Sequence, residues 1–436
     1  MTNPAADSTE ATPTAQANPT STTPDLTASS GASRMAPSVA PSEVSAQVSG
    51  ATQPGLTAVI KPGNTALVLG IVGVIILSIL ALGVAGYLVL SLGGDAVALG
   101  GLMAFIPLAI VFLGVRWIDR WEPEPRLAVL FAFLWGSAVA VIIALVVGSG
   151  VDPVITLVSQ GDDVIYEFIG AAIQAPLVEE SAKGLGLLLI FFVARKYFDG
   201  PVDGVVYAAW VAGGFAFTEN ILYFGSQLLD AGTAFSPDVA YIFFVRGVMS
   251  PFAHVMFTMF TGLALGFAAR RGLGVVGAIG FFLIGLIPAM LLHGLWNGAL
   301  FFVNDFFGYY AIVQFPLFVL AILLVRFLRR QESKLTFDRL SEYASVGWFA
   351  QDEIAALATP RGRRQALEWA GRHGRRPAMK RYIRDATQLA FTRQRIVTGR
   401  GGLGATLDEA AMLSAIIESR SLLVGAGAST PPAAGR

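Results

Sequence analysis

The stretch APLVEESAKGLGLLLIFFVARK, residues 175–196, decides how this chain folds. It is apolar over most of a membrane-spanning length, yet it carries Glu179, Glu180 and Lys183 close together. On insertion scales, a charged side chain at the centre of a membrane helix costs roughly 2.5–3.5 kcal/mol. Such residues therefore indicate a functional site, and the neighbouring segments indicate where their partners lie.

The composition is typical of a membrane protein. Of 436 residues, 54% are hydrophobic and 14% are charged, and the mean hydropathy is +0.64. A soluble domain carries about 25% charged residues. Apolar runs of roughly 18 or more residues recur, which predicts an all-α, polytopic membrane protein. The chain has no cysteine, so disulfides and thiolate nucleophiles are excluded.

Composition divides the chain into three zones. Residues 1–62 are rich in Ala, Ser, Thr and Pro, which predicts a disordered tail. Residues 63–331 are predicted to be the membrane domain, and residues 332–436 a basic, partly helical cytoplasmic tail. About eight transmembrane helices are expected, at 65–92, 96–115, 127–148, 165–194, 203–224, 239–269, 274–300 and 308–328. Pro176 and Pro251 predict breaks in the two longest.

The loops between these spans indicate the orientation. Basic residues occur in alternate loops, at 116–126, 195–196, 270–271 and 326–334, whereas the other loops contain no Lys or Arg. By the positive-inside rule this alternation predicts a multi-pass protein of the cell membrane with both termini in the cytoplasm. The basic tail is expected to be solvated or to contact the lipid bilayer rather than to bind nucleic acid.

Four polar positions on four spans lie at one predicted depth. Glu179, Glu219 and His254 each lie 16 residues from the cytoplasmic end of their span, and His293 lies about 18 residues from its own. At 1.5 Å per residue these positions are about 24–27 Å from the cytoplasmic ends. We therefore expect one site, nearer the outer face, that includes Glu180 beside Glu179.

Neighbouring residues extend this predicted site. Glu179 and Lys183 share one helix face, whereas Glu180 is expected to point about 100° away. Lys183 could tune a glutamate or only balance its charge. Asn220 follows Glu219, and Asn297 shares a face with His293; both could be interhelical hydrogen-bonding residues. The pairs Gly262/Gly266 and Gly294/Gly298 have the G-x-x-x-G spacing that allows close helix approach.

Three functions fit such a set of buried residues. A glutamate could act as general base on water, with the histidines polarising the water or stabilising an oxyanion. We expect no cofactor; the alternative is a divalent metal held by His254, His293 and a glutamate. An ion- or proton-coupled transporter or channel would also use buried ionisable groups, but no inverted repeat is recognisable. A non-catalytic scaffold would use the tail to recruit a partner.

The motifs resemble those of one family. EESAK (179–183) resembles the E-E-x-x-K motif of the PrsW family of glutamic intramembrane proteases. FAFTEN (215–220), HVMFT (254–258) and HGLWN (293–297) resemble the second, third and fourth motifs, in order, and DRWEPEP (119–125) resembles a further feature.

The resemblance implies a membrane protease related to the superfamily of CAAX prenyl endopeptidases and bacteriocin-immunity proteins. It implies catalytic roles for Glu179, Glu180, Glu219, His254 and His293, with Lys183, Asn220 and Asn297 in support. The implied reaction is cleavage of a membrane-spanning protein substrate near the extracytoplasmic face. The best-known role in the family is site-1 cleavage of an anti-sigma factor, a case of regulated intramembrane proteolysis.

Overall fold

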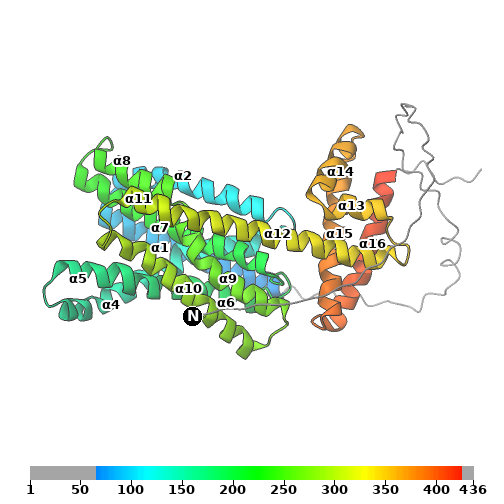
Figure 1. Cartoon of the computed structure of the whole chain (residues 1–436), viewed down its shortest axis with the longest axis horizontal. Helices are drawn as coiled ribbons and strands as arrows, with labels where there is room; N and C mark the ends of the chain where they lie inside the picture. The colour runs from blue at the N-terminus through cyan, green and yellow to red at the C-terminus, as the bar shows by residue number, and fades with distance from the viewer. Residues whose placement is uncertain (1–64, 425–436) are drawn as a thin grey trace, which may run out of the picture. The chain divides into compact units, whose positions relative to one another are not determined.

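The computed structural model describes residues 65–424, and these form helices and no strands. The all-α prediction is confirmed; the predicted disordered tail, 1–62, lies outside the described residues. The helical segments of the membrane part are α1 (Thr65–Leu92), α2 (Gly94–Ile118), α3 (Arg126–Leu134), η3 (Trp135–Ala140), α4 (Val141–Ser159), α5 (Asp163–Phe168), η4 (Ile169–Gln174), α6 (Ala175–Val193), α7 (Pro201–Ala231), α8 (Pro237–Phe243), η5 (Phe244–Met249), α9 (Ala253–Arg270), α10 (Val275–Gly298), η6 (Ala299–Phe301), α11 (Phe306–Tyr309), η7 (Tyr310–Gln314) and α12 (Phe315–Ala344). Figure 1 shows these helices side by side in one bundle.

Seven helical segments within residues 65–424 are long and apolar enough to cross a membrane. They correspond to seven of the eight predicted spans. The remaining span, 165–194, is the continuous helix formed by α5, η4 and α6. Its length is sufficient, but Glu179, Glu180 and Lys183 lower its hydropathy and raise its charge. The charged residues that indicate the site therefore also prevent hydropathy and charge from identifying the helix that carries them as a membrane span.

Helix α7 lies at the centre of the bundle and packs tightly on α9. A Cβ atom on Gly204 would lie 2.0 Å from the carbonyl oxygen of Gly262, and a Cβ atom on Gly262 would lie 2.1 Å from the carbonyl oxygen of Gly204. Only glycine permits this backbone contact. The close approach predicted from the Gly262/Gly266 spacing is confirmed, and it holds the two helices that carry Glu219 and His254 against each other.

Two of the site helices are irregular just before their functional residues. The π-helical segment η4 ends at Gln174, and α6 begins with Ala175 and Pro176. The π-helical segment η5 ends at Met249, and α9 begins at Ala253, beyond Pro251. The predicted break at Pro251 is thus present. At Pro176 the helix instead continues, with the π-bulge η4 before the proline, since a π-bulge takes up an extra residue without ending the helix.

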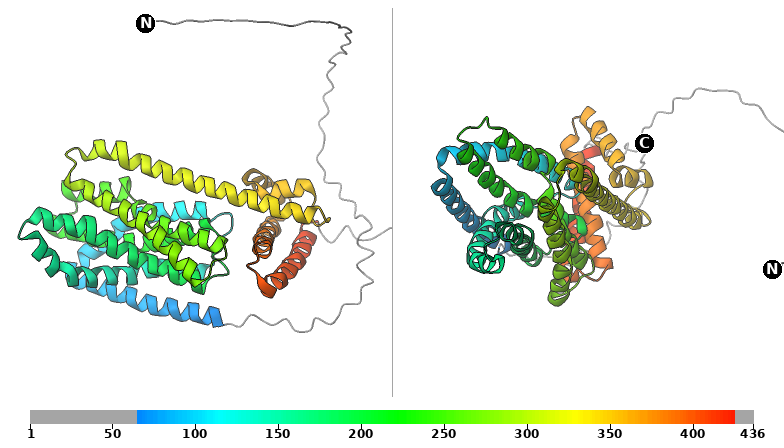
Figure 2. Two further views of the ribbon diagram at one scale, coloured as in Figure 1. Left: turned by 60° about the horizontal axis from the view of Figure 1, so that its bottom comes forward. Right: turned by 60° about the vertical axis from the view of Figure 1, so that its left-hand side comes forward.

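The C-terminal tail is folded. It contains α13 (Gln351–Ala358), α14 (Pro360–Arg372), α15 (Arg376–Val397) and α16 (Gly402–Val424), and its core includes the fully buried Leu340, Ile354, Leu389 and Ile416. Helix α12 passes from the bundle to these helices without interruption (Figures 1 and 2). The predicted domain boundary at 331/332 therefore falls inside a helix, because no glycine or proline marks it.

The loop before α3 joins the membrane helices to the tail. The indole of Trp121 donates to the Thr336 hydroxyl at 3.1 Å, and the Tyr207 hydroxyl donates to Glu124 at 2.6 Å. The guanidinium of Arg363 lies 3.4 Å from the centre of the Trp121 ring and donates to the carbonyl of that residue. Arg363 of the basic tail is thus buried against the loop, although the sequence predicted solvated or lipid-facing arginines.

Candidate active site

Lys183 lies at the centre of a polar cluster among α6, α9 and α10. Its Nζ is 2.8 Å from Glu180 Oε1, 3.2 Å from Glu179 Oε2 and 3.1 Å from His254 Nδ1. The side chain is fully buried, and Nζ also lies 4.0 Å from the centre of the Phe215 ring. An ammonium has three N–H donors and no acceptor. All three can be matched to these three acceptors, so the buried charge is fully satisfied.

The prediction that Glu180 points away from Lys183 is wrong. Residues three apart on a helix are neighbours just as residues four apart are. The ammonium is in fact closer to Glu180, at i−3, than to Glu179, at i−4. Lys183 therefore bridges the two adjacent carboxylates.

The contacts of His254 fix its protonation. Because the Lys183 ammonium only donates, Nδ1 of His254 accepts, and the ring proton of the neutral imidazole lies on Nε2. That nitrogen is 2.9 Å from Glu219 Oε2, to which it donates. The histidine thus connects the lysine on α6 to the glutamate on α7.

Glu180 is the most enclosed member of the cluster. Its side chain is 0% exposed, and it accepts from Lys183, from the Thr258 hydroxyl at 2.8 Å and from His293 Nδ1 at 3.1 Å. A carboxylate only accepts, so His293 carries its proton on Nδ1 and leaves Nε2 with a free lone pair. The ring of His293 stacks on Phe257 with a centroid distance of 4.7 Å. Glu180 therefore holds groups from three helices.

Glu179 differs from Glu180 in access. Its side chain is 11% exposed, and its only hydrogen bond within the described residues joins Oε2 to Lys183. The same oxygen lies 4.0 Å from His293 Nε2. Its other oxygen, Oε1, has no partner in the described part of the chain. Glu179 is therefore the carboxylate that can receive an additional group.

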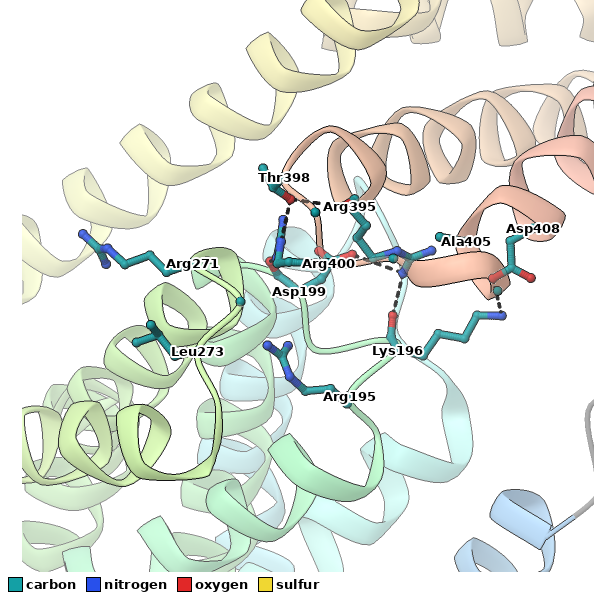
Figure 3. A pocket seen from close by; sticks show the side chains of 14 residues that line it. Arg195, Lys196, Asp199, Arg271, Leu273, Arg395, Thr398, Arg400, Ala405 and Asp408 are labelled. Carbon is teal, nitrogen blue, oxygen red and sulfur yellow. Dashed lines mark hydrogen bonds and ion pairs between the residues drawn. The ribbon is translucent and has the colours of Figure 1, made fainter.

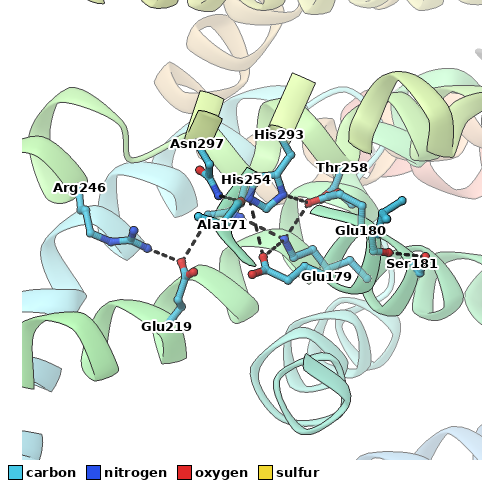
Figure 4. A network of polar contacts seen from close by, with 12 residues as sticks. Ala171, Glu179, Glu180, Ser181, Glu219, Arg246, His254, Thr258, His293 and Asn297 are labelled. Carbon is cyan, nitrogen blue, oxygen red and sulfur yellow. Dashed lines mark hydrogen bonds and ion pairs between the residues drawn. The ribbon is translucent and has the colours of Figure 1, made fainter. Parts of the chain in front are cut away.

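Arg246 is a member of the site that the sequence prediction missed. This arginine lies in η5, ion-pairs with Glu219, and donates to the Asn220 side-chain oxygen at 3.0 Å. Figure 4 shows Arg246 and Glu219 facing each other beside His254. The signal was a single arginine in the apolar run around FVRGVM, within a predicted span. Asn220, the last residue of the E-N motif, thus accepts a hydrogen bond from the arginine of this ion pair.

Asn297 contacts a different part of the bundle. Its side-chain amide donates to the carbonyl oxygen of Ala171, in η4, at 3.0 Å. Asn297 thus fastens α10 to the helix that enters the site, as an interhelical hydrogen-bonding residue.

Glu179, His254 and His293 could hold a divalent metal. One potential ligand atom from each lies within 4.8 Å of the others. Two histidines and a carboxylate are a ligand set found at catalytic zinc sites, and the free lone pair of His293 Nε2 suits it. The residues therefore fit a metal by their chemistry. Lys183 competes for the same atoms, since its ammonium already bonds to Glu179 and His254.

The structure brings together all five residues predicted to be catalytic. His293 lies 3.1 Å from Glu180 and 4.0 Å from Glu179. Lys183 bridges the two carboxylates, and His254 links Lys183 to Glu219. The predicted convergence of four spans on one site is confirmed as geometry. Counting residues along the helices found the common depth but could not specify the rotation of each helix, which determines these contacts.

Comparison with known proteins gives a consistent match over the membrane part. Residues 124–321 match the family described as PrsW family intramembrane metalloprotease. The protein named Protease PrsW from Clostridioides difficile is 30% identical over 196 residues, which cover 45% of this chain and 76% of the relative. Protease PrsW from Oceanobacillus iheyensis is 31% identical over 176 residues, which cover 38% of this chain and 70% of the relative. No solved structure gives a significant match.

Proposed function

Because the chain belongs to the PrsW family of intramembrane proteases, we propose that it hydrolyses a membrane-spanning protein substrate with Glu179 as the general base. As a family member the chain is a peptidase. The assignment of the base rests on one observation: Glu179 is the partly exposed member of the glutamate pair and has an oxygen without a partner in the described residues.

The proposed reaction needs one water molecule. Glu179 accepts a proton as the water oxygen bonds to the scissile carbonyl carbon, and a tetrahedral intermediate forms. Cleavage of the C–N bond then releases an amine, to which Glu179 returns the proton, and a carboxylic acid. The free lone pair of His293 Nε2, 4.0 Å from Glu179 Oε2, can accept a hydrogen bond from the same water and orient it.

The other residues position this pair. Glu180 holds Lys183, Thr258 and His293, and it has no exposed surface on which to bind water. Glu219 holds the proton of His254 on Nε2, an arrangement in which a carboxylate orients an imidazole. We therefore propose that Glu179 is the base and that the adjacent Glu180 holds the surrounding side chains in position.

An apolar groove lies beside the segment that precedes the proposed base. A cavity of about 300 Å³ lies between α4 and the η4–α6 helix, and its lining includes Ile155, Ile173, Leu177 and Val178. These last two residues directly precede Glu179. We propose that the substrate helix lies here. We propose further that this chain lies in the cell membrane with both of its termini in the cytoplasm, and that it cuts the substrate near the extracytoplasmic face. A single-span anti-sigma factor is the proposed substrate type.

A metal-dependent form of the same activity is the second candidate. The donor set of Glu179, His254 and His293 favours it, as does the description of the matched family as a metalloprotease. When bound, a zinc ion would polarise the carbonyl and activate the water. Without a metal, the Lys183 ammonium supplies the positive charge between the same carboxylate and imidazole. We propose the metal-free form.

Cleavage in proteoliposomes tests these assignments. A single-span substrate is incubated with the wild-type protein, Glu179→Gln, Glu180→Gln and the control Glu167→Gln, an exposed residue of α5 on the same continuous helix. We expect Glu179→Gln to lower kcat by about 10²–10⁴ without lowering the unfolding temperature, since a general base contributes about that factor. Glu180→Gln should lower both, and Glu167→Gln neither.

Several results would contradict the proposal. If wild type cuts nothing, the substrate or the activity is wrong; if Glu179→Gln cuts normally, the base is wrong. Two results together would favour the metal-dependent form. A chelator would abolish cleavage and added zinc would restore it, and zinc would bind to the wild-type protein but not to His293→Ala. Ion flux through the same proteoliposomes without cleavage would favour the transporter.

A further inference from the structure

A second cavity lies where the membrane helices meet the C-terminal helices. Its volume is about 600 Å³, within the roughly 300–1,000 Å³ usual for ligand sites. One wall comprises the segments that follow α6 and α9, and the other comprises the end of α15 and the start of α16 (Figure 3). It is separate from the glutamate site, and its lining shares no residue with that site.

The cavity lining carries excess positive charge. Five basic side chains line it, against two carboxylates, which leaves a formal surplus of three; the basic residues are Arg195, Lys196, Arg271, Arg395 and Arg400, and the acidic ones are Asp199 and Asp408. The carboxylates are already engaged. Lys196 lies 3.0 Å from Asp408, and Arg395 lies 3.5 Å from Asp199. The surplus therefore belongs to the other three arginines.

None of those three arginines forms an ion pair with a carboxylate within the described residues, although the charge of Asp199 acts on Arg195 and Arg400. Arg195 and Arg400 both donate to one backbone carbonyl oxygen, that of Ala269, at 3.3 and 2.7 Å. Arg271 has no hydrogen bond or ion pair within the described residues and lies against the Phe267 and Phe281 rings. A carbonyl oxygen satisfies a donor but does not neutralise a charge. The carboxylate near Arg195 and Arg400, that of Asp199, is already paired with Arg395, so the formal surplus of positive charge in the lining remains.

Glycines bring these groups together. Gly272 has φ +67°, and a Cβ atom on it would lie 2.7 Å from Arg400 Cγ. Gly399, with φ +71°, ends α15 and turns the chain toward Arg400. A side chain at Gly272 would displace Arg400 from the wall. The local backbone therefore places guanidinium groups of both walls around one space.

We propose that this cavity binds a phosphate-bearing anion, which bridges the membrane helices and the C-terminal helices. Guanidinium groups suit phosphate because their planar N–H donors match its oxygens, and a bound phosphate would supply negative charge that the lining lacks. The cavity adjoins the ends of α6 and α9, where phospholipid headgroups lie in a bilayer. The phosphate can therefore come from an anionic lipid or from a soluble compound such as a nucleotide.

The experiment uses the full chain in nanodiscs, at constant ionic strength because salt screens exposed charges. One arm compares phosphatidylcholine nanodiscs with nanodiscs that also contain phosphatidylglycerol. The other adds pyrophosphate or ATP to the phosphatidylcholine sample. Bound ligand is measured by native mass spectrometry, and the unfolding temperature is recorded. We expect one ligand per chain and a higher unfolding temperature in at least one arm; the responding arm identifies the source.

The matched variants are Arg271→Glu, in the cavity, and Arg326→Glu, on α12. Both arginines are exposed, and neither has a hydrogen-bond or ion-pair partner in the described part of the chain, so both variants should fold. Arg271→Glu should weaken binding at least about tenfold, the equivalent of one charged hydrogen bond, and Arg326→Glu less than about twofold. Equal effects of the two variants would indicate general attraction to anions and overturn the proposal. So would the absence of binding in both arms.

Discussion

Replacing Lys183 by methionine measures how far the buried ammonium stabilises the protein. Methionine keeps an unbranched chain of similar length but has no charge. Lys183 and Glu180 have no exposed side-chain surface, and Nζ lies 2.8 Å from one carboxylate and 3.2 Å from the next. Removing one member of a buried ion pair costs about 3–5 kcal/mol, because the other charge stays buried without compensation. Two carboxylates are left here, so we expect a loss of about 5 kcal/mol.

The assay is unfolding of the solubilised protein in mixed micelles, followed by tryptophan fluorescence. The control is Lys334→Met, since this lysine also forms an i,i+4 ion pair, with Asp338, although in the reverse order, and its side chain is 75% exposed. An exposed pair contributes about 0–1 kcal/mol. The double variant Lys183→Met/Glu180→Gln removes one charge of each sign and should recover more than half of the loss. If Lys183→Met is no more destabilising than Lys334→Met, the ammonium does not hold the cluster.

Three further predictions concern other parts of the structure. Gly262→Ala should destabilise the protein by about 3 kcal/mol, because the new Cβ atom would overlap a backbone carbonyl of α7, whereas Gly280→Ala, with open space around it, should be neutral in the same unfolding assay. Arg246→Leu should cost about 2 kcal/mol, because Glu219 loses a charged hydrogen-bond donor; Glu219→Gln added to this variant should restore stability. Burial raises the pKa of the Asp119 carboxyl to about 6. The folded state therefore binds this proton more tightly than the unfolded state, so the free energy of unfolding should fall as pH rises from about 4 to 6. In thermal unfolding, Asp119→Asn should make that decline with pH less steep.

Apolar length predicted most of the fold. Span ends at 92, 201 and 270 agree with the sequence prediction within about two residues, because glycine, proline or paired arginines mark them. The helix that carries the last predicted span, 308–328, continues to Ala344 through a polar sequence without helix-breaking residues. Hydropathy predicts where a helix leaves the apolar interior of the membrane. It does not predict where the helix itself ends.

The residues predicted for the site lie together in the structure, but Arg246 was missed and the contacts were predicted only in part. Helix periodicity alone separated Glu180 from Lys183, whereas a long lysine side chain reaches both i−3 and i−4. The bond between Lys183 and His254 joins residues 71 positions apart. It depends on how α6 and α9 are rotated about their axes, and their apolar sequences do not specify that rotation. Glycine contacts at Gly204 and Gly262 fix the position of α9 on α7, which only the folded backbone reveals.

Arg246 shows why counting charges in loops, which predicts an orientation, does not find every residue of the site. The positive-inside rule considers arginines near the ends of spans, and an arginine within a predicted span has no place in that count. Inside the membrane, however, its charge needs a partner, and Glu219 supplies it. Glu219 therefore has two tasks, since it also fixes the proton of His254. A carboxylate shared by an arginine and a histidine is poorly available to accept a proton from water, which supports the proposal that Glu179 rather than Glu219 is the base.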